Sequence, residues 1–380
     1  MIVVRHSLTH FLMQIILLST LIFTMAYFVV GYFSVPFVDA EPLREWKFVY
    51  ENKVLVVYAV INSTLLVLLY FSVSSYFKIS YLILFSFFTL LFSIFFNGNF
   101  PSPMFYFSIL NVYVVFYVLL RSKFKFGNIS RITLWILIFY VVIPVLISIF
   151  GGVINFLNNI PPLFIFSSFR GFTFDRVEYG IVAGYLLLIL MVGEKKYFFT
   201  IVPFVIYGVL MTEARAIIVA LLFAYLYLFR RNLKLLFFFT LSLPVLFFIL
   251  IGISNRVELL DTDGGRFDFY SASIVQIFNS LLSFLWGVGE FYTPVDKYNV
   301  VPHNFIFQTL LNFGIFVFLA WTLIVMNVWS KLNDKGRVFL IYSLTLGLFH
   351  PGYDGFIFLP FSALGYYLAV FYGLNKEKYI

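Results

Sequence analysis

Long apolar runs separated by short polar segments limit the folds that this chain of 380 residues can adopt. Apolar side chains make up 62% of the residues and charged side chains only 11%, which is far from the composition of water-soluble domains. In lipid a backbone must satisfy its own hydrogen bonds, and the runs lack the alternating polarity of a membrane β-barrel. The sequence therefore predicts an all-α, polytopic integral membrane protein, and it disfavours a cytosolic enzyme, a disordered scaffold and a nucleic-acid-binding protein.

Charged residues and clusters of Gly, Pro and Asn mark the ends of the apolar runs. Because one span needs roughly 20 residues, about twelve spans fit into the chain and leave no room for a separate soluble domain. We therefore expect a single transmembrane domain over residues 1–380. The expected spans are 11–35, 54–77, 80–97, 103–120, 132–150, 178–193, 197–211, 216–229, 235–253, 306–329, 338–350 and 356–373.

Basic residues are distributed unequally between alternate loops. Sixteen of the 25 Lys and Arg residues, but only three of the 17 acidic residues, fall on the side of the two termini. Since cytoplasmic loops are enriched in Lys and Arg, both termini are predicted to lie in the cytoplasm. Most of the net charge of +8 then orients the chain and does not indicate an acidic partner.

Three segments on the opposite, outer side are larger than a turn requires. They are the loops 151–177 and 254–305 and the turn Thr212–Arg215. Within the second loop, residues 266–286 carry apolar side chains at helical spacing, with polar side chains on the opposing side. This pattern predicts an amphipathic helix, which either lies in the outer membrane interface or packs as a lid on the helical bundle.

Arginines on the outer side are candidates for anion binding, because a planar guanidinium makes bidentate contacts with phosphate groups. Arg170 lies among aromatic residues and a glycine, and Arg266 directly follows two glycines at the start of the expected amphipathic helix. Arg215 is the third candidate, with Glu213 as a supporting residue. The alternative for Arg215 is a local ion pair with Glu213.

Two histidines are candidates for acid–base chemistry at the same outer level. His303 precedes Asn304, which can cap the following helix. A neutral imidazole there could take a proton from an incoming hydroxyl, or it could be a hydrogen-bonded structural residue. His350 is the second candidate, and Asp354 could orient an imidazole or a substrate, or cap a turn.

Cofactor and metal chemistry has no support in the sequence. There is no cysteine, which excludes disulfides, thiolate zinc sites and cysteine nucleophiles. We also find no nucleotide-binding loop and no carboxylates or histidines at metal-ligand spacing. The expected chemistry therefore uses no metal and no cofactor.

Four segments carry a resemblance to a known family. TEARAIIVALLFAYLYLF at 212–229 is similar to a Ser/Thr-x-x-Arg turn that opens an apolar helix, and GGRFDFY at 264–270 to a segment with a periplasmic arginine. GVGEFYTPVDKYNVVPHNFIFQTLLNFG at 287–314 is similar to a Gly-x-Gly, His-Asn and downstream Gly pattern. FRGFTFDRVEYG at 169–180 is similar to another arginine motif, with nine intervening residues where ten are usual. In order and spacing the chain resembles the O-antigen polymerase and O-antigen ligase family of bacterial glycosyltransferases.

The resemblance implies a GT-C-like helical enzyme that acts on undecaprenyl-diphosphate-linked oligosaccharide at the periplasmic face of the bacterial inner membrane. It implies that His303 removes the proton of the acceptor hydroxyl, which attacks the anomeric carbon and inverts it without a metal. Arg170, Arg215 and Arg266 would neutralise the diphosphate leaving group. A chain-length regulator in the inner membrane would be a second partner.

Three functions stay open at the level of the sequence. A polymerase joins lipid-linked repeat units, a ligase transfers the polysaccharide to lipid A core, and a flippase moves the lipid-linked oligosaccharide across the membrane. The absence of an internal repeat and the scarcity of charges within the spans disfavour the flippase. We expect a polymerase, because the chain diverges from the family outside its motifs and polymerases are the more variable branch.

Overall fold

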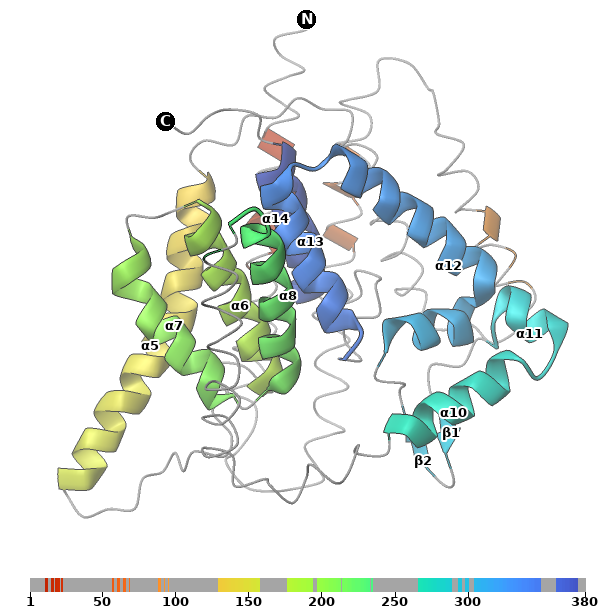
Figure 1. The fold of residues 1–380 in the computed structure, drawn as a ribbon, viewed down its shortest axis with the longest axis horizontal. Coiled ribbons are helices and arrows are strands. Elements are labelled where there is room, and N and C mark those ends of the chain that lie inside the picture. The colour runs from red at the N-terminus through yellow and green to blue at the C-terminus, as the bar shows by residue number, and fades with distance from the viewer. Residues whose placement is uncertain are drawn as a thin grey trace, which may run out of the picture. The chain divides into compact units, whose positions relative to one another are not determined.

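The computed structural model describes the chain mainly from residue 129 onward. Described are 129–157, 176–193, 197–212, 214–232, 234, 266–288, 293–295, 298–300, 304–349 and 360–374, with scattered helical positions between 11 and 95. Nearly all of these residues are helical (Figure 1), as expected for the all-α class. The exception is a short antiparallel hairpin of β1 (Thr293–Val295) and β2 (Tyr298–Val300), which the sequence analysis did not predict.

Every expected span that falls in the well-described part of the chain is a helix. These spans correspond to α5 (Ile129–Leu157), α6 (Arg176–Val192), α7 (Phe198–Met211), α8 (Arg215–Phe229), α12 (Phe305–Lys331), α13 (Asp334–Gly347) and α14 (Pro360–Leu374). Two further helices, α10 (Arg266–Ile277) and α11 (Leu281–Trp286), lie in the expected loop 254–305. The expected spans 103–120 and 235–253 lie outside the described residues. Spans 11–35, 54–77 and 80–97 are represented only by scattered helical positions.

Among the described residues, two helical segments, Ile132–Phe150 and Phe305–Lys331, are long and apolar enough to cross a membrane by length and composition. These two segments support the general prediction of a helical membrane protein. The number of spans and the sidedness of the loops stay predictions. At the predicted outer loop 151–177, α5 continues as far as Leu157 and α6 already begins at Arg176, so both ends of that segment are helical.

The chain divides into two compact units, each described here by itself. One contains 21–54 and 126–260, and therefore α5 to α8; the other contains 1–20, 55–125 and 261–380, and therefore α10 to α14 with the hairpin. The division into two compact units does not test the prediction of a single transmembrane domain over 1–380. The expected loop 254–305 contains α10, α11 and the hairpin, and its residues 254–265, 289–292, 296–297 and 301–303 lie outside the described part.

In the first unit, α6 is the central helix and contacts α5, α7 and α8. It is apolar on all sides, which is typical of a helix surrounded by other helices. The Tyr179 hydroxyl of α6 donates a hydrogen bond of 2.7 Å to the Val141 carbonyl of α5. Val141 lies three residues before Pro144, where the proline ring interrupts the hydrogen-bond ladder of α5. The side chains of α6 that are at most 1% exposed are Tyr179, Ile181, Val182, Ala183, Tyr185, Leu186, Leu188, Ile189 and Leu190.

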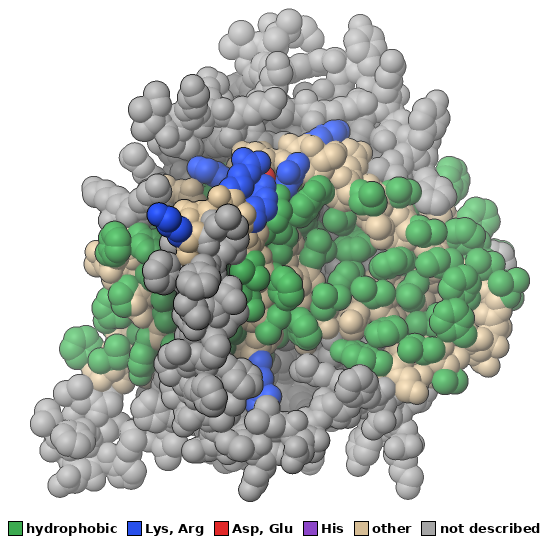
Figure 2. Space-filling view, in the orientation of Figure 1, with side chains coloured by type: hydrophobic (Ala, Val, Ile, Leu, Met, Phe, Trp, Pro, Cys, Tyr) green, Lys and Arg blue, Asp and Glu red, His purple; other side chains and the backbone are tan. Residues whose placement is uncertain are grey.

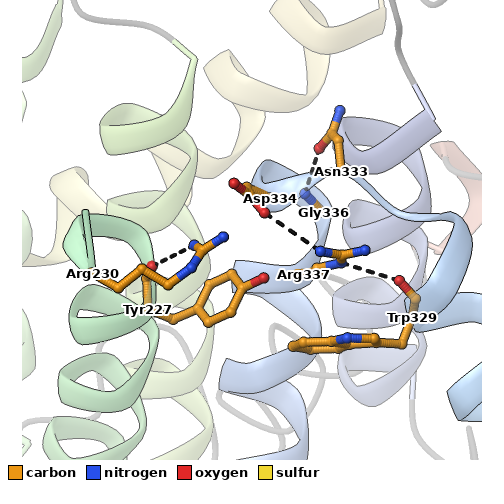
Figure 3. A network of polar contacts seen from close by, with 7 residues as sticks. All are labelled: Tyr227, Arg230, Trp329, Asn333, Asp334, Gly336 and Arg337. Carbon is orange, nitrogen blue, oxygen red and sulfur yellow. Dashed lines mark hydrogen bonds and ion pairs between the residues drawn. The ribbon is translucent and has the colours of Figure 1, made fainter.

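Arg230 ends this unit's helix α8. Its Nη1 donates a hydrogen bond of 2.8 Å to the Tyr227 carbonyl, and its guanidinium carbon lies 3.9 Å from the centre of the Tyr227 ring (Figure 3). A cation at this position interacts favourably with the free carbonyls at a helix C-terminus. Arg230 therefore contributes to ending α8 where the sequence places the end of the span.

In the second unit, the turn between α12 and α13 is fixed by polar contacts (Figure 3). Asn333 caps α13 by accepting a hydrogen bond from the Gly336 N–H at 3.1 Å. Arg337 donates from Nε to the Trp329 carbonyl at 3.1 Å and lies 3.5 Å from the Asp334 carboxylate. The Asn333 amide nitrogen also donates to the Tyr372 carbonyl of α14 at 3.2 Å. The turn thus joins three helices.

Helices α13 and α14 approach closely at Gly336. A Cβ atom at Gly336 would collide with the Ala369 carbonyl and with the Cα of Gly373. We expect Gly336→Ala to lower the free energy of unfolding by about 1–3 kcal/mol, the usual cost of inserting a methyl group where backbone cannot move away. Thermal unfolding of the detergent-solubilised protein measures the effect. Lys335→Ala, at the exposed neighbouring position, is the matched control and should change stability by less than about 0.5 kcal/mol. Equal melting temperatures for Gly336→Ala and wild type would contradict this packing.

Candidate functional site

The N-terminus of α12 lies directly after the His303-Asn304 pair. The Asn304 side-chain oxygen accepts hydrogen bonds from the Ile306 N–H at 2.9 Å and the Phe307 N–H at 3.5 Å. Its backbone is extended, as expected for a residue that precedes a helix. The predicted capping role of Asn304 is therefore confirmed. His303 itself lies outside the described residues.

Helix α12 carries a buried polar stripe, defined here as Gln308, Thr309 and Asn312. Their side chains are 0%, 1% and 1% exposed. Asn304, Gln308 and Asn312 follow each other at intervals of four residues, so they share one face of the helix. Polar groups buried in an apolar spanning helix are expensive and usually mark a functional site. This stripe was not predicted from the sequence, although its four-residue spacing stands out in an otherwise apolar run.

Immediately after the stripe, α12 is interrupted at Gly314. Gly314 has φ 75° and ψ −176°, a conformation open essentially to glycine alone. Gly287, which ends α11, has nearly the same conformation, with φ 82° and ψ 178°. These are the two glycines with positive φ in the described part of the chain.

The two glycines face each other across a backbone contact that we call the glycine clasp, formed by Leu285–Gly287 and Asn312–Gly314. A Cβ at Gly314 would collide with the Leu285 carbonyl, and a Cβ at Gly287 would lie 2.5 Å from the Asn312 carbonyl carbon and from the Phe313 nitrogen. The Val288 N–H donates a 2.6 Å hydrogen bond to the Leu311 carbonyl beside the clasp. Both glycines belong to the motif segment 287–314, and the close approach of the two backbones is the physical reason for them.

The expected amphipathic helix 266–286 is two helices, and the single-helix prediction was wrong. The chain breaks at Phe278–Ser280, and the Ser280 hydroxyl accepts a hydrogen bond from the Ser283 N–H at 3.0 Å to start α11. Asn279 and Ser280 belong to the residue types whose short polar side chains compete with helical hydrogen bonding, which accounts for the break.

Helices α10 and α11 pack on α12 with one side and expose apolar residues on the other. On the packed side, Ser273 and Ile277 are buried, and the Trp286 ring lies 4.9 Å from the Phe316 ring between centroids. On the other side, Val275 and Leu281 are 66% and 73% exposed, and Figure 2 shows apolar side chains gathered over this part of the molecule. The packing agrees with the alternative in which this segment covers the helical bundle, and a location in the outer membrane interface stays a prediction.

Helices α10 and α12 begin at the same end of this unit. The Tyr270 and Phe307 rings are in contact, with centroids 5.1 Å apart. Tyr270 lies one helical turn after Arg266, and Phe307 lies four positions after His303 in the sequence. The contact therefore brings the first turn of α10, which begins at Arg266, next to the first turn of α12. Of Arg266 the structure describes the backbone, as the first residue of α10.

Arg215 is the first residue of α8, and its side chain is exposed. The turn before it is held by Thr212, whose hydroxyl donates to the Val209 carbonyl at 2.6 Å and accepts from the Ala214 N–H at 3.3 Å. No described residue forms a hydrogen bond or ion pair with the Arg215 guanidinium. Glu213, the predicted local partner, lies outside the described residues.

The other predicted site residues, Arg170, His350 and Asp354, also lie outside the described part. The described residues include no group of three or more His, Asp or Glu side chains that could hold a metal ion. The chain matches no protein-family model, no curated protein and no solved structure.

Proposed function

We propose that the chain is an O-antigen polymerase, which joins undecaprenyl-diphosphate-linked repeat units at the periplasmic face of the bacterial inner membrane. The observation that carries the proposal is the ring contact between Tyr270 and Phe307. It brings together the starts of two helices: α10, whose first residue is Arg266, and α12, which begins two residues after His303. The two motif residues are 37 positions apart in the sequence, so sequence proximity does not account for the contact between the first turns of α10 and α12.

The glycine clasp supports the same proposal. In the segment that resembles the family's Gly-x-Gly, His-Asn and Gly pattern, the first and the last glycine each lie against the backbone that directly precedes the other. The pattern then has a physical meaning: it ties α11, and through it α10, to the middle of α12. A catalytic base and an anion-binding arginine on those two helices would be held in register by this contact.

In the proposed reaction, His303 accepts the proton of a sugar hydroxyl on the acceptor repeat unit. The hydroxyl oxygen forms a bond to the anomeric carbon of the donor, and the bond from that carbon to the lipid diphosphate breaks with inversion. Arg266 stabilises the negative charge that grows on the diphosphate, a role that the family resemblance also implies for Arg170 and Arg215. Asn304, by capping α12, fixes the point where the chain leaves His303 and enters the helix. A periplasmic site, cytoplasmic termini and a chain-length regulator as partner belong to the same proposal.

Deletion of the gene tests the proposal. We expect the lipopolysaccharide of the deletion strain to carry one repeat unit on the core, because the ligase still transfers single units when no polymer forms. Gel electrophoresis of lipopolysaccharide measures this, and the reintroduced gene should restore the ladder of longer chains.

Three other outcomes would contradict the polymerase. Bare core with accumulated lipid-linked polymer would instead indicate a ligase. Bare core with single lipid-linked units held on the cytoplasmic side would indicate a flippase. An unchanged ladder would exclude all three functions.

A further inference from the structure

Gln308 is the most informative polar residue that the proposed reaction does not use. It lies one turn into α12, it is 0% exposed, and neither its side-chain nitrogen nor its side-chain oxygen has a hydrogen-bond partner in the described part of the chain. A second buried amide oxygen without a hydrogen bond, Oε1 of Gln276, belongs to α10, the helix that packs against α12. Protein interiors rarely leave such groups unpaired, and the exceptions call for an explanation.

The chemistry of the carboxamide limits what can pair with it. Its nitrogen only donates hydrogen bonds and its oxygen only accepts them, and both are unpaired. A diphosphate would satisfy the nitrogen but would be repelled by the oxygen. A hydroxyl group donates and accepts at the same time, so it matches both atoms. The residue therefore suits a neutral, hydroxyl-bearing ligand better than the charged part of the substrate.

We propose that Gln308 binds a hydroxyl group of the acceptor sugar. Gln308 follows Asn304 by four residues on the same face of α12, so it stands one turn inward from the position next to His303. This inference rests on the proposed function, because that function brings a sugar to this end of α12. Since the carboxamide is completely buried, the side chains that cover it must move apart before a sugar hydroxyl can reach it.

A substitution of similar shape separates binding from a structural role. Gln308→Met keeps the length of the side chain and removes both polar atoms. If the carboxamide has no partner within the protein, the variant should unfold at the same temperature as wild type or higher. If the carboxamide holds the fold together, the variant should unfold at a lower temperature, which would overturn the proposal.

Ligand-induced stabilisation then tests binding without relying on polymerisation. The probe is the free oligosaccharide of one repeat unit, prepared from the lipopolysaccharide of the same cells, added to the purified full-length protein. We expect it to raise the melting temperature of wild type and of His303→Ala, and to leave that of Gln308→Met unchanged. Inorganic pyrophosphate, the probe for the arginines, should stabilise wild type and Gln308→Met equally.

Thr322→Val is the matched control on the same helix. The Thr322 hydroxyl bonds to the Phe318 carbonyl of its own helix at 2.8 Å, so its loss should not affect the oligosaccharide shift. In the deletion strain, Gln308→Met should lower the yield of long chains at least about tenfold, while Thr322→Val should restore them. If wild type restores the ladder but the oligosaccharide stabilises Gln308→Met as strongly as wild type, the sugar-binding role is wrong and the polymerase proposal stands. If deletion of the gene leaves the ladder unchanged, the polymerase proposal itself is wrong.

Discussion

Cells that carry His303→Ala in place of the wild-type protein are expected to make lipopolysaccharide with a single repeat unit, like the deletion strain. A general base contributes roughly 10²–10⁴-fold to a reaction rate, so loss of the imidazole should reduce polymerisation by about that factor. The residue precedes the helix cap and does not belong to α12, so the amount of protein in the membrane should stay normal. Lipopolysaccharide banding and an immunoblot of the membrane fraction measure the two quantities.

His6→Ala is the matched control, because it removes a histidine from the predicted cytoplasmic end of the chain. It should leave the ladder of long chains intact. His350→Ala distinguishes the two candidate bases: if it abolishes long chains and His303→Ala does not, the base is His350. Arg266→Lys adds a test of the leaving-group role, since lysine keeps the charge but loses the bidentate contact. A normal ladder in both His303→Ala and Arg266→Lys would remove the chemical basis of the proposed reaction.

The positions of the helices could be predicted because each apolar run must form its own hydrogen bonds. The expected spans 197–211 and 216–229 match α7 and α8 within one residue at each end. The polar turn at Thr212 and the basic residues after Phe229 mark these ends in the sequence. Helix α12, expected at 306–329, was equally predictable, since Asn304 is a strong capping residue and Lys331 ends the apolar run.

The internal features of the second unit could not be predicted in the same way. Apolar spacing over 266–286 is continuous, and the break at Phe278–Ser280 depends on a local hydrogen bond of Ser280 that periodicity does not report. The hairpin at 293–300 is too short to give a periodic signal. Gln308 could have been singled out by its place in an apolar run, but its burial and its missing partners are properties of the packed structure.

The motif glycines Gly287 and Gly314 could be predicted only in part: the sequence indicates their positions, but not their structural role. Gly287 and Gly314 were noticed because their spacing resembles a family pattern, and that resemblance says nothing about their conformation. The structure gives the reason: both have a positive φ, and each lies where a Cβ would collide with the other's backbone segment. The spacing of the motif is then the length of chain that connects the end of α11 to the middle of α12.

Gly314→Ala is therefore expected to destabilise the protein more than Gly336→Ala does. Strain at this backbone conformation and the collision with the Leu285 carbonyl should together cost about 2–5 kcal/mol, a large part of the roughly 5–15 kcal/mol that stabilises a domain. Because the added methyl group weakens the contact between α11 and α12, limited proteolysis should cut the 281–300 segment faster in the variant. Gly193→Ala is the control, because Gly193 is exposed and does not have a positive φ. This variant should have the same melting temperature as the wild type.

The clasp also makes a prediction about the double variant. Gly287→Ala and Gly314→Ala each separate the same two backbone segments, so once one methyl group has forced them apart, the second meets less resistance. The loss of stability in the double variant should therefore be clearly smaller than the two single losses taken together, as is usual for groups in direct contact. Independent, additive losses would mean that each glycine is required only for its own backbone conformation. In that case α11 would be attached to α12 by its side chains, such as Trp286 on Phe316, and the spacing of the two glycines would have no structural meaning.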